Sequence, residues 1–275
     1  MSSSGGRCQP GPRRGRLLIV EFIGTPGSGK TTLSNELVSL LQEDGIDAST
    51  IISAAREHGL RAVAGQAIVR FTPRSLRRAF LWELFYLLST LHIAPFTLEH
   101  FRLTRFVLRT QLGRPIPMAA RRRALYWFFQ LAGRCRFLRA TSRDREILVV
   151  DDGFLHRSVN LNASHVEEPD ACQVKAYVDL APKPDLVVFT VAGRDTCERR
   201  IRERGVWPHR RHLSPAELSR YLRNAELVVG LAVQRARERG WTVVEVNNED
   251  REPDQVRIDL RKSVGHLLAE SSPRG

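Results

Sequence analysis

The sequence predicts an α/β fold: a five-stranded parallel sheet with an all-helical segment inserted into it. Five short runs are rich in apolar or β-branched residues, as buried strands are, and they alternate with longer segments of helical periodicity. Between the second and third runs, residues 72–145 carry helical spacing alone. Right-handed crossovers would then place helices on both faces of the sheet, which gives three layers.

The five strands are expected at residues 17–23, 48–53, 146–150, 184–191 and 241–246. A helix over about 29–43 follows the first strand. Asp195-Thr196-Cys197-Glu198 has capping-box spacing for a short helix that ends at Gly205. Ser214-Pro215-Ala216-Glu217 starts a long helix that stops at Gly240, and Pro253 opens a terminal helix. Strands and helices therefore alternate as a parallel sheet requires.

The inserted segment predicts three helices. Thr72-Pro73 is a start signal, and apolar residues then recur at helical spacing: Phe80, Leu84, Leu87, Leu88 and Leu91. Pro95 is expected to break this helix, Thr97 to cap a second one that runs to about Leu112, and a third is expected over about 119–139.

The third of these helices is rich in arginines and aromatic residues. It carries Arg121, Arg122, Arg123, Arg134, Arg136 and Arg139 together with Leu125, Trp127, Phe128, Phe129 and Phe137. Three interpretations stay open: a membrane-surface helix, a pocket for an aromatic anion, or a core helix with a solvated arginine face.

Length and composition favour one domain over residues 17–270. The chain has 275 residues, of which 42 % are apolar, enough for a large core. Residues 1–16 consist mostly of Ser, Gly, Pro and Arg, which predicts a disordered basic tail instead of a secretory signal, and residues 271–275 are expected to be a second disordered tail. The apolar window 79–98 contains Glu83, His92 and Pro95 and is not expected to span a membrane.

The net charge of +13 comes almost wholly from arginine. It fits a phosphate-rich ligand, nucleic acid or an anionic membrane surface, and equally a coding bias towards arginine. No nucleic-acid reading module is recognisable, so nucleic acid is not expected as a partner. The four cysteines are far apart and form no C-x-x-C pair, so neither a disulfide framework nor a zinc site is indicated, and a reducing, cytoplasmic setting is the simplest expectation.

The most informative motif follows the first strand directly. It matches the Walker A pattern G-x-x-x-x-G-K-[ST] and is made of Gly24, Thr25, Pro26, Gly27, Ser28, Gly29, Lys30 and Thr31, followed by Thr32. Glycines let backbone N–H groups turn inward around an anion, and the next helix presents its N-terminus to that anion. Lys30 can reach the outer phosphates, and Thr31 is placed to bind magnesium. The alternative is a glycine-rich turn without a ligand.

Polar residues follow two of the other strands. Arg56 and Glu57, in Arg56-Glu57-His58-Gly59, come after the second strand, where open α/β sheets bind ligands, although the segment is equally an ordinary helix start. Asp151-Asp152-Gly153 ends the third strand. An Asp at this place can hold magnesium, and a neighbouring carboxylate can take the proton of an attacking hydroxyl. Arg157, in the following helix, can face the same cleft.

Arginines are dense from Arg199 to Arg211. Arg200 and Arg204 lie in the predicted short helix, and Arg210 and Arg211 lie in the loop after it. An arginine-bearing segment that closes over a nucleotide would neutralise charge on a transferred phosphoryl group, so the loop is expected to be a lid. The alternative is a solvated helix face.

With these residues placed, the chain resembles the thymidylate kinase-like branch of the P-loop nucleoside and nucleotide kinases. Arg56-Glu57-His58-Gly59 looks like the family's Arg-Glu-Pro-Gly segment, Asp151 falls where its Asp-Arg-Tyr motif begins, and 200–205 is similar to its Arg-x-x-x-Arg-Gly lid stem. Residues 72–145 have no clear counterpart. Pro26, His58 and Asp152-Gly153 depart from the family's pattern at its substrate-reading positions.

The resemblance implies the P-loop NTPase three-layer sandwich with strand order 2-3-1-4-5, and ATP and Mg²⁺ as cofactors. We expect an ATP-dependent kinase for a small-molecule acceptor: a nucleoside, a nucleotide or another hydroxyl-bearing metabolite. The expected catalytic residues are Lys30, Asp151, Asp152, Arg200 and Arg204. The alternative is an ATPase or nucleotide switch that docks on a membrane or protein partner through its basic helices; a homodimer stays open.

Overall fold

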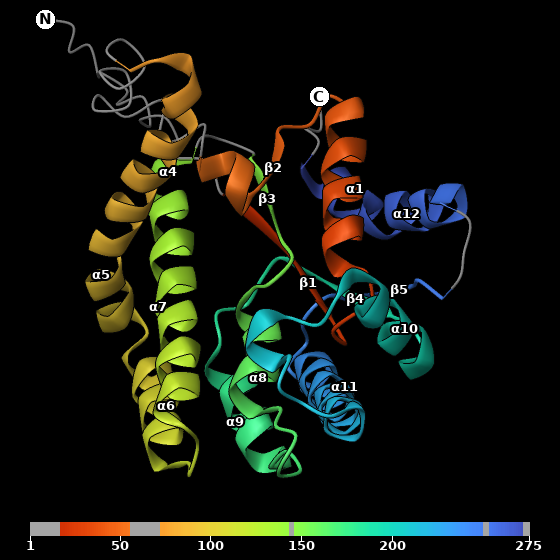
Figure 1. Cartoon of the computed structure of the whole chain (residues 1–275). Helices are drawn as coiled ribbons and strands as arrows, with labels where there is room; N and C mark the ends of the chain where they lie inside the picture. The colour runs from red at the N-terminus through yellow and green to blue at the C-terminus, as the bar shows by residue number, and fades with distance from the viewer. Residues whose placement is uncertain (1–16, 56–71, 143–145, 250–252, 272–275) are drawn as a thin grey trace, which may run out of the picture.

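The computed structural model describes residues 17–55, 72–142, 146–249 and 253–271. Its centre is a five-stranded, all-parallel sheet in the order β2-β3-β1-β4-β5 (Figure 1), as the sequence predicts. The strands are β1 (Leu18–Gly24), β2 (Ala48–Thr50), β3 (Ile147–Val150), β4 (Leu186–Val191) and β5 (Val243–Asn247).

Helices cover both faces of the sheet. They are α1 (Lys30–Glu43), α4 (Arg74–Leu91), α5 (Ile93–Glu99), α6 (Phe101–Gly113), α7 (Met118–Thr141), α8 (Phe154–Asn162), α9 (Ala171–Leu180), α10 (Arg194–Arg204), the short 3₁₀ helix η1 (Pro208–Arg210), α11 (Pro215–Glu238) and α12 (Pro253–Ser271). On one face, α1 and α12 pack on the fully buried Val20 and Phe22 of β1. On the other face, α7, α8, α9 and α11 enclose a larger core that includes Ile19 and Ile23. Side chains that alternate along β1 thus pack against the helical layers on both faces of the sheet.

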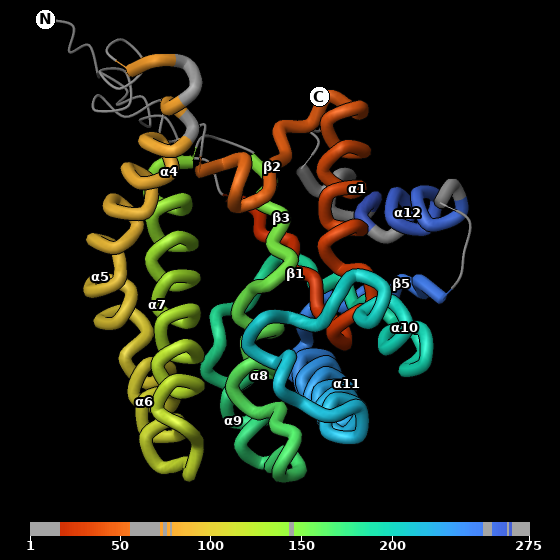
Figure 2. The backbone as a smooth tube through the Cα atoms, viewed as in Figure 1, coloured from red at the N-terminus to blue at the C-terminus, as the bar shows by residue number. Residues whose placement is uncertain are grey.

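The inserted segment stands to one side of the sheet. Within residues 72–142 the structure contains helices and no strands, as predicted. Figure 2 shows α4, α5 and α6 along the outer edge, with α7 beside them. Besides α7, α6 contacts α9, and Phe96 of α5 stacks on Phe154 of α8. The contact between α4 and α7 is close, because a Cβ on Gly133 would come within 2.3 Å of the Ser89 carbonyl oxygen. The insertion is therefore a packed layer of the domain.

The helix breaks in the insertion differ from those predicted. The first helix ends at Leu91, four residues before Pro95, because proline has no N–H to donate to the Leu91 carbonyl. Pro95 itself lies inside α5. Thr97 also lies inside α5 and does not cap a helix; the next helix begins after His100, whose backbone (φ −115°, ψ 42°) leaves the helical region.

Two further predictions of local structure are wrong. The second strand ends at Thr50, not Ser53, because the Thr50 and Ser53 side chains each accept from the other's backbone N–H and start a helix at residue 51. The helix after β4 begins at Arg194, and Asp195 does not cap it. Instead the Glu249 carboxylate, which follows β5, accepts from the Gly193 backbone N–H and the Thr196 hydroxyl. A residue more than fifty positions away thus holds the start of this helix, which has no side-chain cap.

One helix was not expected. In α9, the Asp170 carboxylate caps the start by accepting from the backbone N–H groups of Cys172 and Gln173, at 2.8 and 3.2 Å. The start of α11 is as predicted, with Ser214 and Glu217 forming a reciprocal capping box and Pro215 in the first turn. The last helix reaches Ser271, one residue into the predicted C-terminal tail.

Candidate nucleotide site

The loop between β1 and α1, residues 24–31, can only be built with glycines. Gly27 and Gly29 both have φ of +90°, which side chains with a Cβ rarely adopt. A Cβ on Gly27 would come within 2.5 Å of the Cys197 carbonyl oxygen, and one on Gly29 within 2.2 Å of the Asn248 amide nitrogen. The loop is therefore held between the start of α10 and the residue that follows β5.

Lys30 is folded into this loop. Its Nζ donates to the carbonyl oxygens of Gly24 and Thr25, at 2.8 and 3.1 Å, and only 9 % of the residue is exposed. Desolvation by burial lowers the pKa of Lys30 to about 8, although the charges of Asp152 and Asp151 act in the opposite direction. An anion in the loop would replace the missing water and favour the charged ammonium.

Thr31 and Asp151 meet across the sheet. Because β1 and β3 are adjacent and parallel, their carboxyl ends lie together, and the Thr31 hydroxyl donates to Asp151 Oδ2 at 2.8 Å. A hydroxyl and a carboxylate side by side can act as ligands of Mg²⁺. This ion usually keeps several waters and binds only one or two protein carboxylates together with phosphate oxygens. No cluster of three or more His, Cys, Asp or Glu side chains suited to a metal occurs in the described parts of the chain. A metal here would thus depend on phosphate.

Asp152 points away from its neighbour. Its Oδ2 lies 2.8 Å from Arg157 Nη2, and its Oδ1 lies 4.0 Å from His156 Nε2. Desolvation raises the pKa of Asp152, although its side chain is still 43 % exposed, and the Arg157 charge partly offsets this. Burial also lowers the pKa of His156 well below its ordinary value, so the imidazole is neutral. The two adjacent carboxylates therefore have separate partners, one on the Thr31 side and one on the Arg157 side.

Glu21 is a site residue that the sequence reasoning missed. It is 2 % exposed in the middle of β1, and its Oε1 accepts from the His156 backbone N–H at 3.0 Å. Burial raises the pKa of Glu21 to about 8. A Cβ on Gly153 would come within 2.3 Å of Glu21 Cδ, so the turn after Asp152 rests directly on this carboxyl group. The available signal was a charged residue inside an otherwise apolar strand.

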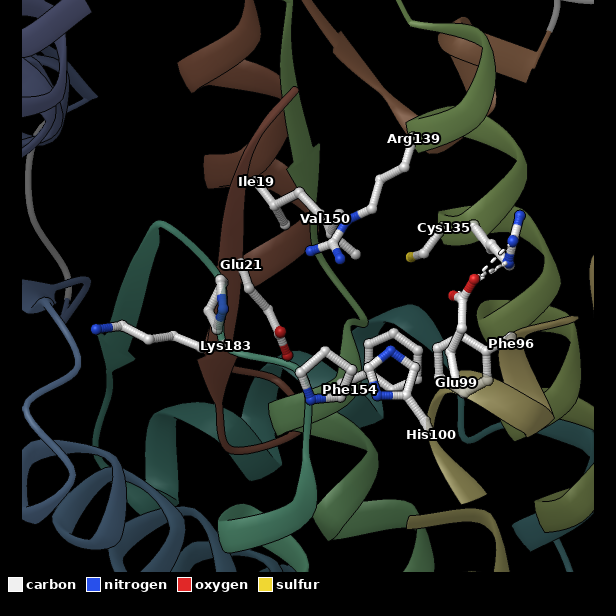
Figure 3. Close-up of a pocket in the computed structure, with 13 residues that line it drawn as sticks. Ile19, Glu21, Phe96, Glu99, His100, Cys135, Arg139, Val150, Phe154 and Lys183 are labelled. Atoms are coloured by element: carbon white, nitrogen blue, oxygen red, sulfur yellow. Dashed lines mark hydrogen bonds and ion pairs between the residues drawn. The ribbon is translucent and has the colours of Figure 1, made fainter. Parts of the chain in front are cut away.

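A pocket extends from Glu21 towards the insertion (Figure 3). Its empty volume is about 480 Å³, part of it open to solvent, and it lies between β1, α5 and α7. Phe96 and Phe154 line it with parallel rings whose centroids are 5.3 Å apart, and Arg139 lies on the opposite side from them. No motif predicted this pocket, because its residues come from five separate segments.

Arg200, one of the predicted lid arginines, lies beside the loop. Arg200 Nη1 would be 3.9 Å from a Cβ on Gly29, and Arg200 Nη2 donates to the Asn248 carbonyl oxygen at 3.0 Å. Its Nη1 is buried without a hydrogen-bond partner among the described residues. Arg204 lies over the Trp207 ring, yet its charge contributes to lowering the pKa of Lys30, so it too is near the loop.

The arginines of the loop after α10 contact other residues. The Arg210 guanidinium lies over the Tyr221 ring, 3.5 Å from its centroid, and Arg211 Nε donates weakly to the Val206 carbonyl oxygen at 3.4 Å. Neither contacts the loop 24–31. The lid prediction thus depends on a rearrangement that this structure does not contain.

The insertion contributes cationic and aromatic side chains near Arg157. The Arg134 guanidinium lies 5.4 Å from the centroid of the Trp82 ring, and the hydroxyls of Tyr86 and Tyr126 are 2.7 Å apart. Burial lowers the pKa of Arg134, and the Arg157 charge adds to this shift. Among the described residues, Nε of both arginines is buried without a hydrogen-bond partner. The insertion thus brings buried positive charge and aromatic rings together.

Two predicted substrate residues, Arg56 and Glu57, lie outside the described residues. Thr32 is exposed at the start of α1, and Pro26 is buried within the loop. Neither a scan against protein-family models nor a search of curated proteins finds a match to this chain.

Proposed function

We propose that this protein is an ATP-dependent kinase that phosphorylates a small-molecule acceptor, with a P-loop of the thymidylate kinase-like type at residues 24–31. The observation that carries the proposal is the hydrogen bond between Thr31 and Asp151, formed beside the buried ammonium of Lys30. A glycine loop, a lysine, a hydroxyl and a carboxylate from the adjacent strand are the groups that ATP with magnesium requires. Bound magnesium would neutralise charge on the outer phosphates.

The roles follow from the contacts of each side chain. Lys30 would leave the carbonyls of Gly24 and Thr25 and donate to the transferred phosphoryl group, where a charge-assisted hydrogen bond is strongest. Thr31 and Asp151 would hold the metal side. The Arg200 guanidinium, with one buried nitrogen unpaired among the described residues, is oriented to donate to phosphate oxygens.

Asp152 is the candidate base. A general base must lie close to the acceptor hydroxyl and must be able both to take up its proton and to release it again. A carboxylate with a raised pKa takes up a proton more readily than an ordinary one, and the pKa of Asp152 is raised. Arg157 fixes its orientation through the 2.8 Å ion pair. The acceptor would then lie between α8 and the insertion, near Arg134 and Trp82. A nucleoside, a nucleotide or another hydroxyl-bearing metabolite fits those side chains.

A second candidate function is a P-loop ATPase or nucleotide switch that docks through its insertion and transfers phosphate to water. The exposed apolar and basic side chains of α4 to α6 favour it, because a pocket for a small acceptor does not need them. The buried Nε groups of Arg134 and Arg157, which have no hydrogen-bond partner among the described residues, favour the kinase, since an attacking water needs no such donors.

The test is a screen for ADP release with nucleosides, nucleoside monophosphates, sugars and hydroxylated antibiotics as acceptors. Lys30→Ala is the blank, and Lys262→Ala, which removes an exposed lysine on α12, is the matched control. Release that depends on one acceptor class and is lost only in Lys30→Ala supports the kinase. Release that ignores every acceptor but rises with anionic vesicles would support the switch.

A further inference from the structure

The positive charge of the protein is concentrated in the insertion. Residues 72–141 contain thirteen arginines, no lysine and only two acidic residues, Glu83 and Glu99, a net charge of +11 out of +13 for the whole chain. A coding bias towards arginine would spread the excess over the chain, and the rest of the chain is nearly balanced. The insertion therefore has an electrostatic property of its own.

Large apolar side chains are exposed on the outer side of the same segment. Leu87 and Leu91 on α4 are 60 % and 66 % exposed, Leu98 on α5 is 78 % exposed, and Phe101 on α6 is 58 % exposed. On α4, the buried residues Leu81, Phe85 and Ser89 occupy the opposite side and face α7. We call the exposed side chains of α4, α5 and α6 the outer face; Figure 1 shows these helices at the edge of the molecule.

Arginines stand among these apolar side chains without counter-ions. Arg102, Arg105 and Arg109 are exposed on α6 at helical spacing, and within the described ranges no ion pair or hydrogen bond engages their side chains. Several exposed arginines elsewhere are paired: Arg194 with Glu226, Arg237 with Glu245 and Arg261 with Asp44. Arg220 and Arg223 on α11 are exposed without an ion pair among the described residues, but they do not stand in the insertion. The outer face thus combines unpaired positive charge with apolar surface.

We propose that the outer face docks on an anionic membrane surface, whether the phosphoryl group goes to a metabolite or to water. Lipid headgroups supply negative charge at the level of the arginines, and the interface accepts leucine and phenylalanine side chains. Phosphates of nucleic acid would satisfy the arginines and leave the apolar side chains in water. A second copy of the chain would bring two faces of like charge together, which costs free energy.

The helix lies on the membrane and does not cross it. Residues Ala79–Glu99 are, within the described ranges, the one helical segment long and apolar enough to span a bilayer, with a mean hydropathy of 1.3. A core helix of the same composition would be mostly buried, but only 22 % of this window is buried. The other side of α4 packs on α7 through Leu81 and Phe85. A helix that spans the bilayer would have to give up this packing.

Vesicle co-sedimentation of the full chain tests the proposal. Vesicles of phosphatidylcholine alone are compared with vesicles in which about one third of the lipid is phosphatidylglycerol. Each arginine near an anionic surface contributes about fivefold to the partition coefficient, so Arg102→Gln/Arg105→Gln/Arg109→Gln should lower binding on the order of 100-fold. The matched control, Arg194→Gln/Arg237→Gln/Arg261→Gln, removes the same charge from paired sites and should bind nearly as the wild type does.

Two further experiments distinguish the contribution of charge from that of apolar contact, and membrane binding from other partners. Leu91→Ser/Leu98→Ser should weaken binding to anionic vesicles while the charge is unchanged, and raised salt should weaken the wild type. Equal binding to both lipid compositions, or equal losses in the arginine variant and its control, would overturn the proposal. So would a dimer in sedimentation equilibrium that the leucine variant abolishes, or retention by duplex DNA in place of vesicles.

Discussion

Replacing Glu21 by Gln should change how the stability of the protein depends on pH. The folded-state pKa of Glu21 is about 8, against an ordinary value of 4.5, because the carboxyl group is buried under the Gly153 turn. Between these two values the folded protein keeps a proton that the unfolded chain releases. The stabilisation from this group is therefore fully present below about pH 4.5 and is lost as the pH rises through 8.

The magnitude follows from the same two values. One pKa unit corresponds to about 1.4 kcal/mol, so the free energy of unfolding of the wild type should fall by about 2 to 3 kcal/mol relative to Glu21→Gln between pH 5 and pH 7. The amide can still accept from the His156 N–H and has no charge to desolvate. All other groups titrate alike in both proteins and cancel in the comparison.

The assay is urea unfolding of both proteins at each pH, followed by circular dichroism. Glu168→Gln removes a carboxylate from an exposed site and tests whether the loss of any carboxylate produces the same change. A difference between wild type and Glu21→Gln that stays constant across the pH range would refute the placement of a neutral carboxyl group beneath the Asp152 turn.

Three other outcomes are expected. Asp151→Asn should raise the magnesium concentration needed for turnover by at least about tenfold, whereas Asp152→Asn should keep nucleotide affinity and lose roughly 100-fold or more in kcat; full turnover of Asp152→Asn would remove it as the base. ATP affinity, measured by calorimetry, should fall as the pH rises above about 8, where the free Lys30 ammonium loses its proton, and Lys30→Arg should flatten that dependence. Gly27→Ala should abolish nucleotide binding and lower the Tm, because the added Cβ clashes with Cys197. Gly205 has the same φ of +90°, but a Cβ there meets no atom within 4 Å, so Gly205→Ala is the control. Equal effects of the two substitutions would contradict the role of the Cys197 contact.

The sheet could be predicted because strand identity here is a local property. Apolar runs followed by turn residues mark buried strands, and the strand order follows from the resemblance to P-loop kinases; the observed parallel order β2-β3-β1-β4-β5 agrees. The errors arose where a distant or competing contact decides the boundary. Glu249 holds the start of the helix after β4, and the reciprocal bonds of Thr50 and Ser53 end β2 early.

The site could be predicted in part. The glycine pattern indicates a loop with positive φ, and the carboxyl ends of adjacent parallel strands bring Thr31 and Asp151 together. Glu21 and Asn248 could not be read from a motif, because their importance comes from packing against Gly153 and Gly29 in the folded chain. The exposure of Leu87 could not be predicted either, since apolar residues at helical spacing look the same whether or not a neighbour covers them.

The most direct test of the central claim is calorimetric titration of ATP and magnesium into wild type, Lys30→Ala and Lys262→Ala. If residues 24–31 hold the phosphates, Lys30→Ala should lose roughly 2 to 4 kcal/mol of binding free energy, a weakening of about 30-fold to 1,000-fold, with an unchanged circular dichroism spectrum. Lys262→Ala should bind as the wild type does. Equal affinity for ATP in wild type and Lys30→Ala, or no binding to any of the three, would contradict the assignment of this loop as the nucleotide site.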